Sequence, residues 1–103
     1  MDTDLTTAFD TLAPLCDVSA PLCEVAGAGG LDVPLELRAI CARMGLPQAR
    51  AGDVERALTA GQAAGVFFKT KELTWCVREK PLAARLVPLL RGADLYRTRI
   101  HRD

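Results

Sequence analysis

The sequence predicts a mainly α-helical domain with one small antiparallel β-hairpin, in the order four helices, hairpin, helix. Apolar residues recur at three- and four-residue intervals over most of the chain, which is the period of an amphipathic helix. β-branched and aromatic residues cluster in residues 66–78, around a polar turn. The length of 103 residues and the hydrophobic share of 50% suit a single domain with its own core.

Residues 1–30 predict a pair of helices. The first covers residues 4–17, and Pro14 leaves its C-terminal boundary open because proline cannot donate a helical hydrogen bond. In the second, Pro21 falls in the first turn, where proline is favoured, and Gly27–Gly30 end the helix. This part is therefore expected to hold two short helices.

Residues 32–64 predict two helices joined by a tight turn. The first begins at Asp32 or Val33 and ends at Gly45, which suits a left-handed residue just after a helix. The second covers about residues 50–64, with apolar residues on one side. The arrangement predicts a helix-turn-helix.

The remainder predicts a hairpin, a helix and a tail. The hairpin covers residues 66–78 and exposes Lys69 and Lys71 near its tip. A C-terminal helix follows over residues 81–97, and residues 98–103 form a basic tail. We find no internal repeat, so the five parts are expected to build one domain.

The charges are distributed unevenly along the chain. The first 36 residues hold seven acidic residues and no Lys or Arg, whereas the rest holds thirteen basic and six acidic residues. The formal net charge is zero, but a surface field acts locally over about one Debye length, roughly 8 to 10 Å. Either the basic part faces a polyanion, or the two parts neutralise each other within a monomer or a dimer.

The four cysteines predict neither a metal site nor a disulfide framework. Cys16, Cys23, Cys41 and Cys76 contain no CxxC pair, whereas structural zinc sites usually use closely spaced pairs. Small buried thiols in a reducing compartment explain them better. Because Pro21 is expected to begin a new helix, Cys16 and Cys23 are not expected to share one continuous helix.

Several classes of protein are excluded by what the sequence lacks. No apolar run approaches the roughly 18 residues of a membrane span, and the N-terminus has no secretory signal pattern, so we expect a cytoplasmic protein with no membrane partner. Gly27–Gly30 lack the lysine that follows a phosphate-binding loop. The single histidine, His101, lies in the expected tail and is a poor base for a cysteine nucleophile. We therefore expect no enzymatic activity and no cofactor.

Two stretches carry a resemblance to a known class of protein. The expected helix and turn before Gln48 end in LRAICARMGLP, and the next helix contains DVERAL and runs through AGV into the hairpin. Both stretches resemble the winged helix-turn-helix of bacterial transcriptional regulators. The whole chain is similar in its order to the small arsenic-repressor-like regulators and, less closely, to the multiple-antibiotic-resistance-repressor type.

The resemblance implies a DNA-binding module, either a transcriptional regulator or the targeting domain of a larger protein. Its partner would be double-stranded DNA, with the helix from about residue 50 in the major groove and the hairpin, or wing, on the adjacent backbone. The expected contacts are Gln48, Arg50 and Arg56 on the helix side and Lys69 and Lys71 on the wing. Arg and Gln can read G and A edges with two hydrogen bonds each, and Lys neutralises phosphate.

Some features leave an alternative open. Val54 lies eight positions after Leu46, where the family pattern has about five, so the turn is longer or the helix begins a turn early. Asp53 and Glu55 stand where such regulators often have Thr and Ser, and carboxylates repel phosphates. The alternative is a winged-helix module for protein–protein interaction or dimerisation without DNA binding.

The resemblance also implies a homodimer. In the similar regulators the last helix pairs with its symmetry mate and with the first helix. The acidic first third would then meet the basic residues 81–102 across a dimer contact through the N- and C-terminal helices.

Overall fold

The computed structural model of this protein describes the backbone of residues 2–101 and the side chains of residues 5–95. The described elements are, in chain order, helix α1 (Asp2–Leu12), a 3-10 turn (Ala13–Leu15), α2 (Cys16–Gly27), α3 (Leu37–Met44), a second 3-10 turn (Gln48–Arg50), α4 (Ala51–Ala63), strands β1 (Phe67–Lys69) and β2 (Trp75–Val77), and α5 (Lys80–His101). The prediction of a mainly helical fold with a small antiparallel hairpin is confirmed. None of the described helices is long and apolar enough to cross a membrane.

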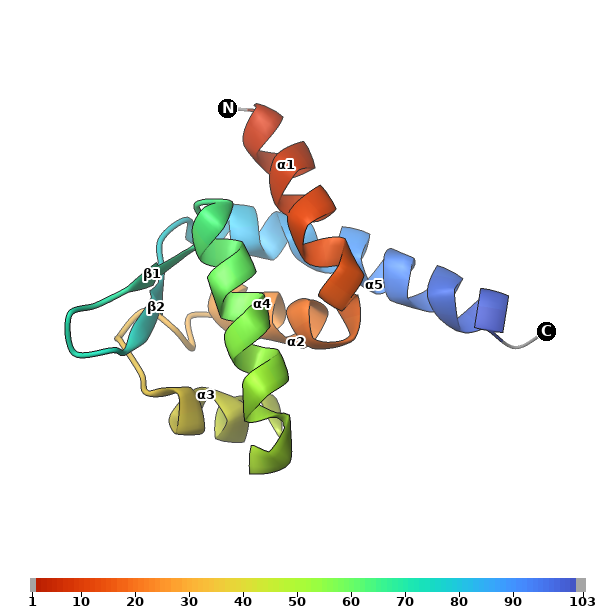
Figure 1. The fold of residues 1–103 in the computed structure, drawn as a ribbon. Coiled ribbons are helices and arrows are strands. Elements are labelled where there is room, and N and C mark those ends of the chain that lie inside the picture. Colours follow the sequence, from red (N-terminus) through yellow and green to blue (C-terminus); the bar gives the residue numbers. More distant parts are fainter. Residues whose placement is uncertain (1, 102–103) are drawn as a thin grey trace.

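Helix α2 lies at the centre of the fold. It packs most extensively on α5, which runs behind it in Figure 1, and also on α4 in front. The approach of α2 to α5 is close, because a Cβ atom added to Gly27 would lie 2.9 Å from the Cα atom of Ala84. Buried apolar residues from all five helices and both strands fill the space between the elements, and the largest are Trp75, Phe67, Leu12, Leu22, Leu31, Ile40, Leu58, Leu86 and Leu90.

Helix α4 is placed by its apolar side. Val54, Ala57, Leu58 and Gly61 are all buried, at the three- and four-residue spacing that the sequence predicts. Gly61 allows the ring of Phe67 to approach, since a Cβ atom there would lie 2.2 Å from the Phe67 Cδ2 atom. The opposite side of α4 is therefore left facing solvent.

The hairpin follows α4 directly and is anchored by aromatic residues. β1 pairs with β2 antiparallel, with Phe67 opposite Val77 and Lys69 opposite Trp75. The other edge of β2 is bonded as well: Trp75 and Leu35 exchange two backbone hydrogen bonds, each with an N–O distance of 2.8 Å. Trp75 is buried, so the end of β2 that adjoins the hairpin loop is fixed to the core.

The prediction that Pro21 begins a new helix is wrong. α2 begins at Cys16 and continues through Pro21, so that Cys16 and Cys23 lie on one helix and are both buried. Proline at this position removes only one hydrogen bond near the start of the helix. The burial of Leu22 and Cys23 beside it favours the continuous helix.

Two further boundaries differ from the prediction. The first helix ends at Leu12 rather than near residue 17, because Pro14 disfavours α-helical geometry just before it and a 3-10 turn takes its place. The third helix begins at Leu37, and not at Asp32 or Val33. The cause is the pairing of Leu35 with Trp75, which holds the preceding segment extended.

The C-terminal helix is longer than the predicted 81–97. α5 runs from Lys80 to His101 without a break at Pro88 or Gly92. Residues 98–101 of the expected tail are therefore helical, since no glycine cap stops the helix, while residues 102 and 103 lie outside the described part. The end of the earlier helix α3 agrees with prediction, because Gly45 takes the left-handed conformation with φ of 72°.

Candidate nucleic-acid interface

The solvent-facing side of α4 carries a row of hydrogen-bonding side chains. Glu55, Arg56, Thr59 and Gln62 are all exposed, and their three- and four-residue spacing places them along one side of the helix. Glu, Arg, Thr and Gln are side chains that contact base edges in the major groove. Of these four, the sequence prediction included only Arg56. The inward-facing residues Val54, Ala57, Leu58 and Gly61 can be recognised in the sequence. The remaining positions of the helix face outward, and they would have indicated the other three residues.

Gln48 lies just before α4 and is hydrogen-bonded to α3. Its Nε2 atom donates a hydrogen bond of 3.2 Å to the backbone carbonyl of Arg38 on α3. The residue belongs to the 3-10 turn that precedes Ala51. The segment between α3 and α4 covers residues 45–50, of which Gln48–Arg50 form the 3-10 turn, and α4 begins at Ala51, three positions before Val54.

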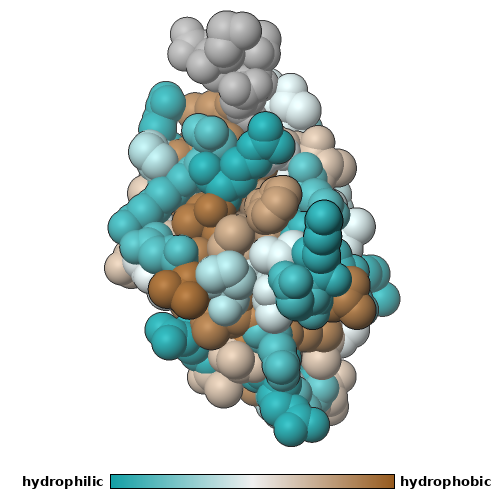
Figure 2. Space-filling model, turned by 90° about the vertical axis from the view of Figure 1, so that its left-hand side faces the viewer, coloured by the Kyte–Doolittle hydropathy of each residue, from teal (hydrophilic) through white to brown (hydrophobic). Residues whose placement is uncertain are grey.

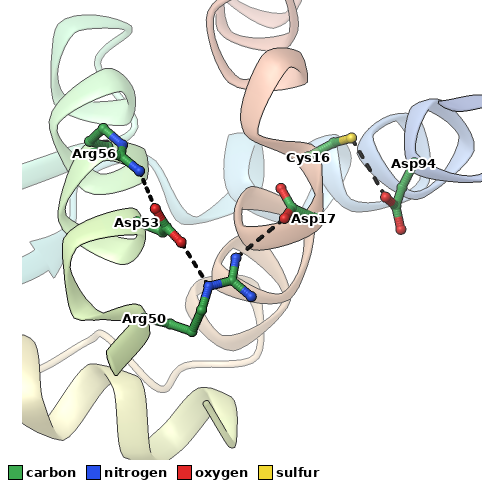
Figure 3. A network of polar contacts seen from close by, with 6 residues as sticks. All are labelled: Cys16, Asp17, Arg50, Asp53, Arg56 and Asp94. Atoms are coloured by element: carbon green, nitrogen blue, oxygen red, sulfur yellow. Dashed lines mark hydrogen bonds and ion pairs between the residues drawn. The ribbon is translucent and has the colours of Figure 1, made fainter. Parts of the chain in front are cut away.

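Arg50 is held by two carboxylates from different helices. Its Nε atom donates to Oδ2 of Asp53 at 2.7 Å, and its Nη2 atom lies 3.3 Å from Oδ2 of Asp17 on α2 (Figure 3). The hydrogen bond to Asp53 is the main cause that raises the pKa of the Arg50 guanidinium, although that group is charged at any physiological pH. Arg50 thus links the start of α4 to α2.

Asp53 lies between two arginines. It accepts a hydrogen bond from Arg50 with one oxygen and from Nη2 of Arg56, one turn further along α4, with the other (Figure 3). The hydrogen bond from Arg50 is the largest cause that lowers the pKa of this carboxyl below its usual range, and the positive charge of Arg56 lowers it further. Asp53 is therefore an anion at neutral pH.

The two predicted lysines of the hairpin lie in different environments. The Nζ atom of Lys69 lies 5.2 Å from the centre of the Trp75 ring, a cation–π distance, and its side chain is half-buried. Lys71 is exposed in the loop between β1 and β2. The five predicted contacts thus do not form one cluster: Arg50 and Arg56 share Asp53, Gln48 bonds to α3, and the lysines lie on the hairpin.

Acidic residues of the first third of the chain form ion pairs with basic residues of the later elements in the same molecule. Three acidic residues of the first third form ion pairs with bases from later elements: Asp17 with Arg50, Asp32 with Lys80 at 3.1 Å, and Glu24 with Arg91 at 2.5 Å. Neutralisation inside the monomer therefore accounts for part of the segregation along the chain. Among the described residues, the exposed Arg38 and Arg43 of α3 make no such pair, and the sequence prediction had not singled them out.

The face that carries the hairpin also shows apolar side chains. Phe68, Leu73 and Val33 are 50%, 68% and 70% exposed. Figure 2 shows this face, where hydrophobic patches lie among hydrophilic side chains. Leu73 stands in the hairpin loop with a positive φ of 64°, so its side chain is presented by a turn that glycine would favour. This face of the molecule therefore carries both basic and apolar exposed side chains.

Three of the four cysteines, Cys16, Cys23 and Cys41, are buried in the core. Burial raises the pKa of Cys23 to about 12 and also raises that of Cys41. The Sγ atom of the buried Cys16 lies 3.8 Å from Oδ1 of Asp94 on α5 (Figure 3). Within the described part of the chain, no cluster of His, Cys, Asp and Glu side chains has the arrangement of a metal site.

Comparison with known proteins finds no family model, no curated protein and no solved structure that matches this chain.

Proposed function

We propose that this chain is a DNA-binding module of the winged helix-turn-helix type, acting as a transcriptional regulator or as the targeting domain of a larger DNA-acting protein. The observation that carries the proposal is the exposed row of Glu55, Arg56, Thr59 and Gln62 on a helix that is followed directly by a hairpin with two lysines. An α-helix with its side chains is about 10 to 12 Å across and fits the roughly 12 Å major groove of B-DNA.

The elements around α4 support the same proposal. α3 packs on α4 and carries the exposed bases Arg38 and Arg43, which suit phosphate contacts from the first helix of such a pair. Lys71, exposed at the hairpin loop, suits the backbone contact of a wing. In this arrangement α4 supplies base contacts, and α3 and the hairpin supply phosphate contacts.

Fluorescence anisotropy with random duplex DNA tests the proposal. We expect micromolar binding at low salt that weakens steeply at physiological salt, because phosphate contacts release counterions. The fourfold variant Arg50→Ala/Arg56→Ala/Lys69→Ala/Lys71→Ala is expected to lose most of this binding. Lys71→Ala alone is expected to weaken it, whereas Arg85→Ala, which removes an exposed base from α5, serves as the matched control and retains it. Absence of binding at low salt, both by the wild type and by a variant in which Asp53 no longer pairs with the arginines, would rule out the DNA-binding function.

A second candidate function is a winged-helix module for protein contact. It is favoured by the exposed Phe68 and Leu73 of the hairpin and by the neutralisation of Arg50 and Arg56 by carboxylates. This function predicts binding to a protein partner that survives Arg56→Ala and Lys71→Ala but is lost in Phe68→Ala. The two sets of variants separate the two functions.

We further propose that the chain forms a homodimer through α1 and α5. Leu89 and Leu95 of α5 are 42% and 68% exposed, and the C-terminal half of α5 extends away from the body of the molecule (Figure 1). Sedimentation equilibrium of the wild type and of Leu89→Glu/Leu95→Glu tests this contact: a dimer that the variant converts to a monomer supports it, and a wild-type monomer at high micromolar concentration contradicts it.

A further inference from the structure

The four charged side chains at the start of α4 form a neutral set. Arg50 and Arg56 contribute two positive charges, and Asp53 and Asp17 contribute two negative charges within hydrogen-bond or ion-pair distance. The chain of contacts runs from Arg56 to Asp53, then to Arg50 and on to Asp17 (Figure 3). Both arginines expected to contact DNA are therefore occupied by carboxylates in the free protein.

The ion pairs among these four side chains are exposed enough to solvent for a bound anion to replace one of the carboxylates. The side chains of Arg50 and Arg56 are 39% and 67% exposed, and those of Asp17 and Asp53 are 52% and 32% exposed. Ion pairs at such exposure are weak, because water and salt screen them. A phosphate presents oxygen acceptors with the same charge sign and similar geometry as a carboxylate, so it can take the place of Asp53 or Asp17 on a guanidinium.

Asp53 opposes such an exchange. It stays ionised at neutral pH, because the hydrogen bond from Arg50 lowers its pKa. It lies in the first turn of α4, where the partial positive charge of the helix end favours an anion, so it remains in place when its arginines are withdrawn. An approaching phosphate must then displace the carboxylate and tolerate its repulsion.

We propose that Asp53, assisted by Asp17, is a built-in competitor of nucleic-acid phosphate that occupies Arg50 and Arg56 in the free protein and thereby lowers the affinity of the α4 surface for DNA. This inference rests on the proposed DNA-binding function and adds to it a way in which the protein limits its own affinity for DNA. The pairing does not involve Thr59 and Gln62 of the same helix, so it lowers only the contribution of Arg50 and Arg56 to binding.

The test compares Asp53→Asn with the wild type in binding to random duplex DNA over a series of salt concentrations. Because Asn keeps the size of Asp and removes the charge, Arg56 loses its carboxylate partner and Arg50 keeps only the longer pair with Asp17. We expect binding about tenfold tighter at low salt and a log–log salt dependence steeper by about one, the value of one added phosphate contact. Asp17→Asn, which removes one of the two carboxylates that contact Arg50, is expected to give a smaller gain. Asp10→Asn on α1 makes the same change in net charge at an exposed residue outside this set of ion pairs and is expected to change affinity little.

A second set of variants separates the release of the two arginines from a general effect of removing one negative charge. In Arg50→Ala/Arg56→Ala, the additional Asp53→Asn is expected to give a much smaller gain than in the wild type, because no arginines are left to release and only the repulsion by Asp53 is removed. Circular dichroism checks that each variant is folded.

The outcomes distinguish this inference from the function on which it rests. If the wild type binds DNA with steep salt dependence and Asp53→Asn binds equally or more weakly, the competitor role is overturned and the DNA-binding function stands. If Asp53→Asn binds DNA and the wild type does not, the competitor role is supported, because Asp53 then blocks binding completely in the wild type. If neither binds at low salt, the DNA-binding function is overturned and the competitor role with it.

Discussion

The two ends of α4 are held in place by different forces. Toward its C-terminal end, Gly61 packs so closely on Phe67 that no side chain fits between them. At its N-terminal end, Arg50 and Asp53 tie the helix to Asp17 of α2 through partly exposed ion pairs. Close packing of apolar groups is insensitive to salt, whereas exposed ion pairs are screened by it. The comparison teaches that one end of α4 is fixed by packing that salt leaves unchanged, and the other by ion pairs that salt weakens.

The largest expected effect comes from filling the packed end. Gly61→Ala places a methyl group against the buried Phe67 ring and is expected to lower the free energy of unfolding by about 1 to 3 kcal/mol, the usual cost of overpacking. Gly52→Ala is the matched control, because a Cβ atom there has no neighbour within 4 Å, and it is expected to raise stability by about 0.5 kcal/mol through helix propensity. Urea denaturation followed by circular dichroism measures both. Equal effects of the two substitutions would contradict the described packing.

A smaller effect is expected at the charged end. Asp17→Asn removes the ion pair with Arg50 and also a favourable charge in the first turn of α2, so it is expected to cost only a fraction of the Gly61→Ala loss. In 1 M NaCl, where the Debye length is about 3 Å, this loss should disappear, whereas that of Gly61→Ala should persist. Urea denaturation at low and high salt measures the difference. A loss for Asp17→Asn that salt leaves unchanged would show that the charged end is held by something other than ion pairs.

The smallest effect concerns pH. The folded pKa of Asp53 lies below its ordinary value, chiefly because Arg50 donates a hydrogen bond to the charged form, so the folded state favours the ionised carboxyl. This contribution is present above the unfolded pKa of about 3.9 and is lost as the pH falls through the lower folded value. The stability difference between wild type and Asp53→Asn should therefore stay constant from pH 7 to about 5 and shrink below about pH 4. The difference for Gly61→Ala should not follow this course.

Local signals in the sequence predicted the fold class and most of its elements. Gly45 predicted the end of α3 because a left-handed residue after a helix is a property of the local chain. The alternation around Trp75 predicted the hairpin for the same reason. Pro21 misled the prediction, since its tolerance inside α2 depends on the packing of that helix in the core. The extended segment at Leu35 depends on its distant partner Trp75, which no local pattern reveals.

The candidate site was predicted less completely than the fold. Residue type and motif indicated Arg50 and Arg56, but not that Asp53 would bind both. The spacing of three residues on each side of Asp53 was visible in the sequence, and on a helix it places all three side chains on one side. The approach of Asp17 could not be inferred in this way, because it requires the packing of α2 beside the start of α4.

The double pairing of Trp75 has a consequence for self-association of the chain. Sheet edges with unpaired backbone groups are templates for strand addition by other molecules. Leu35 covers the outer edge of β2 at Trp75, and the backbone carbonyl of Leu31 accepts a further hydrogen bond from Val77 at 2.9 Å. Within the described residues, the edge left uncovered is that of β1, which is three residues long and ends in Lys69. A short edge that ends in a charge is a poor template, so the hairpin can stand out from the body without recruiting further strands.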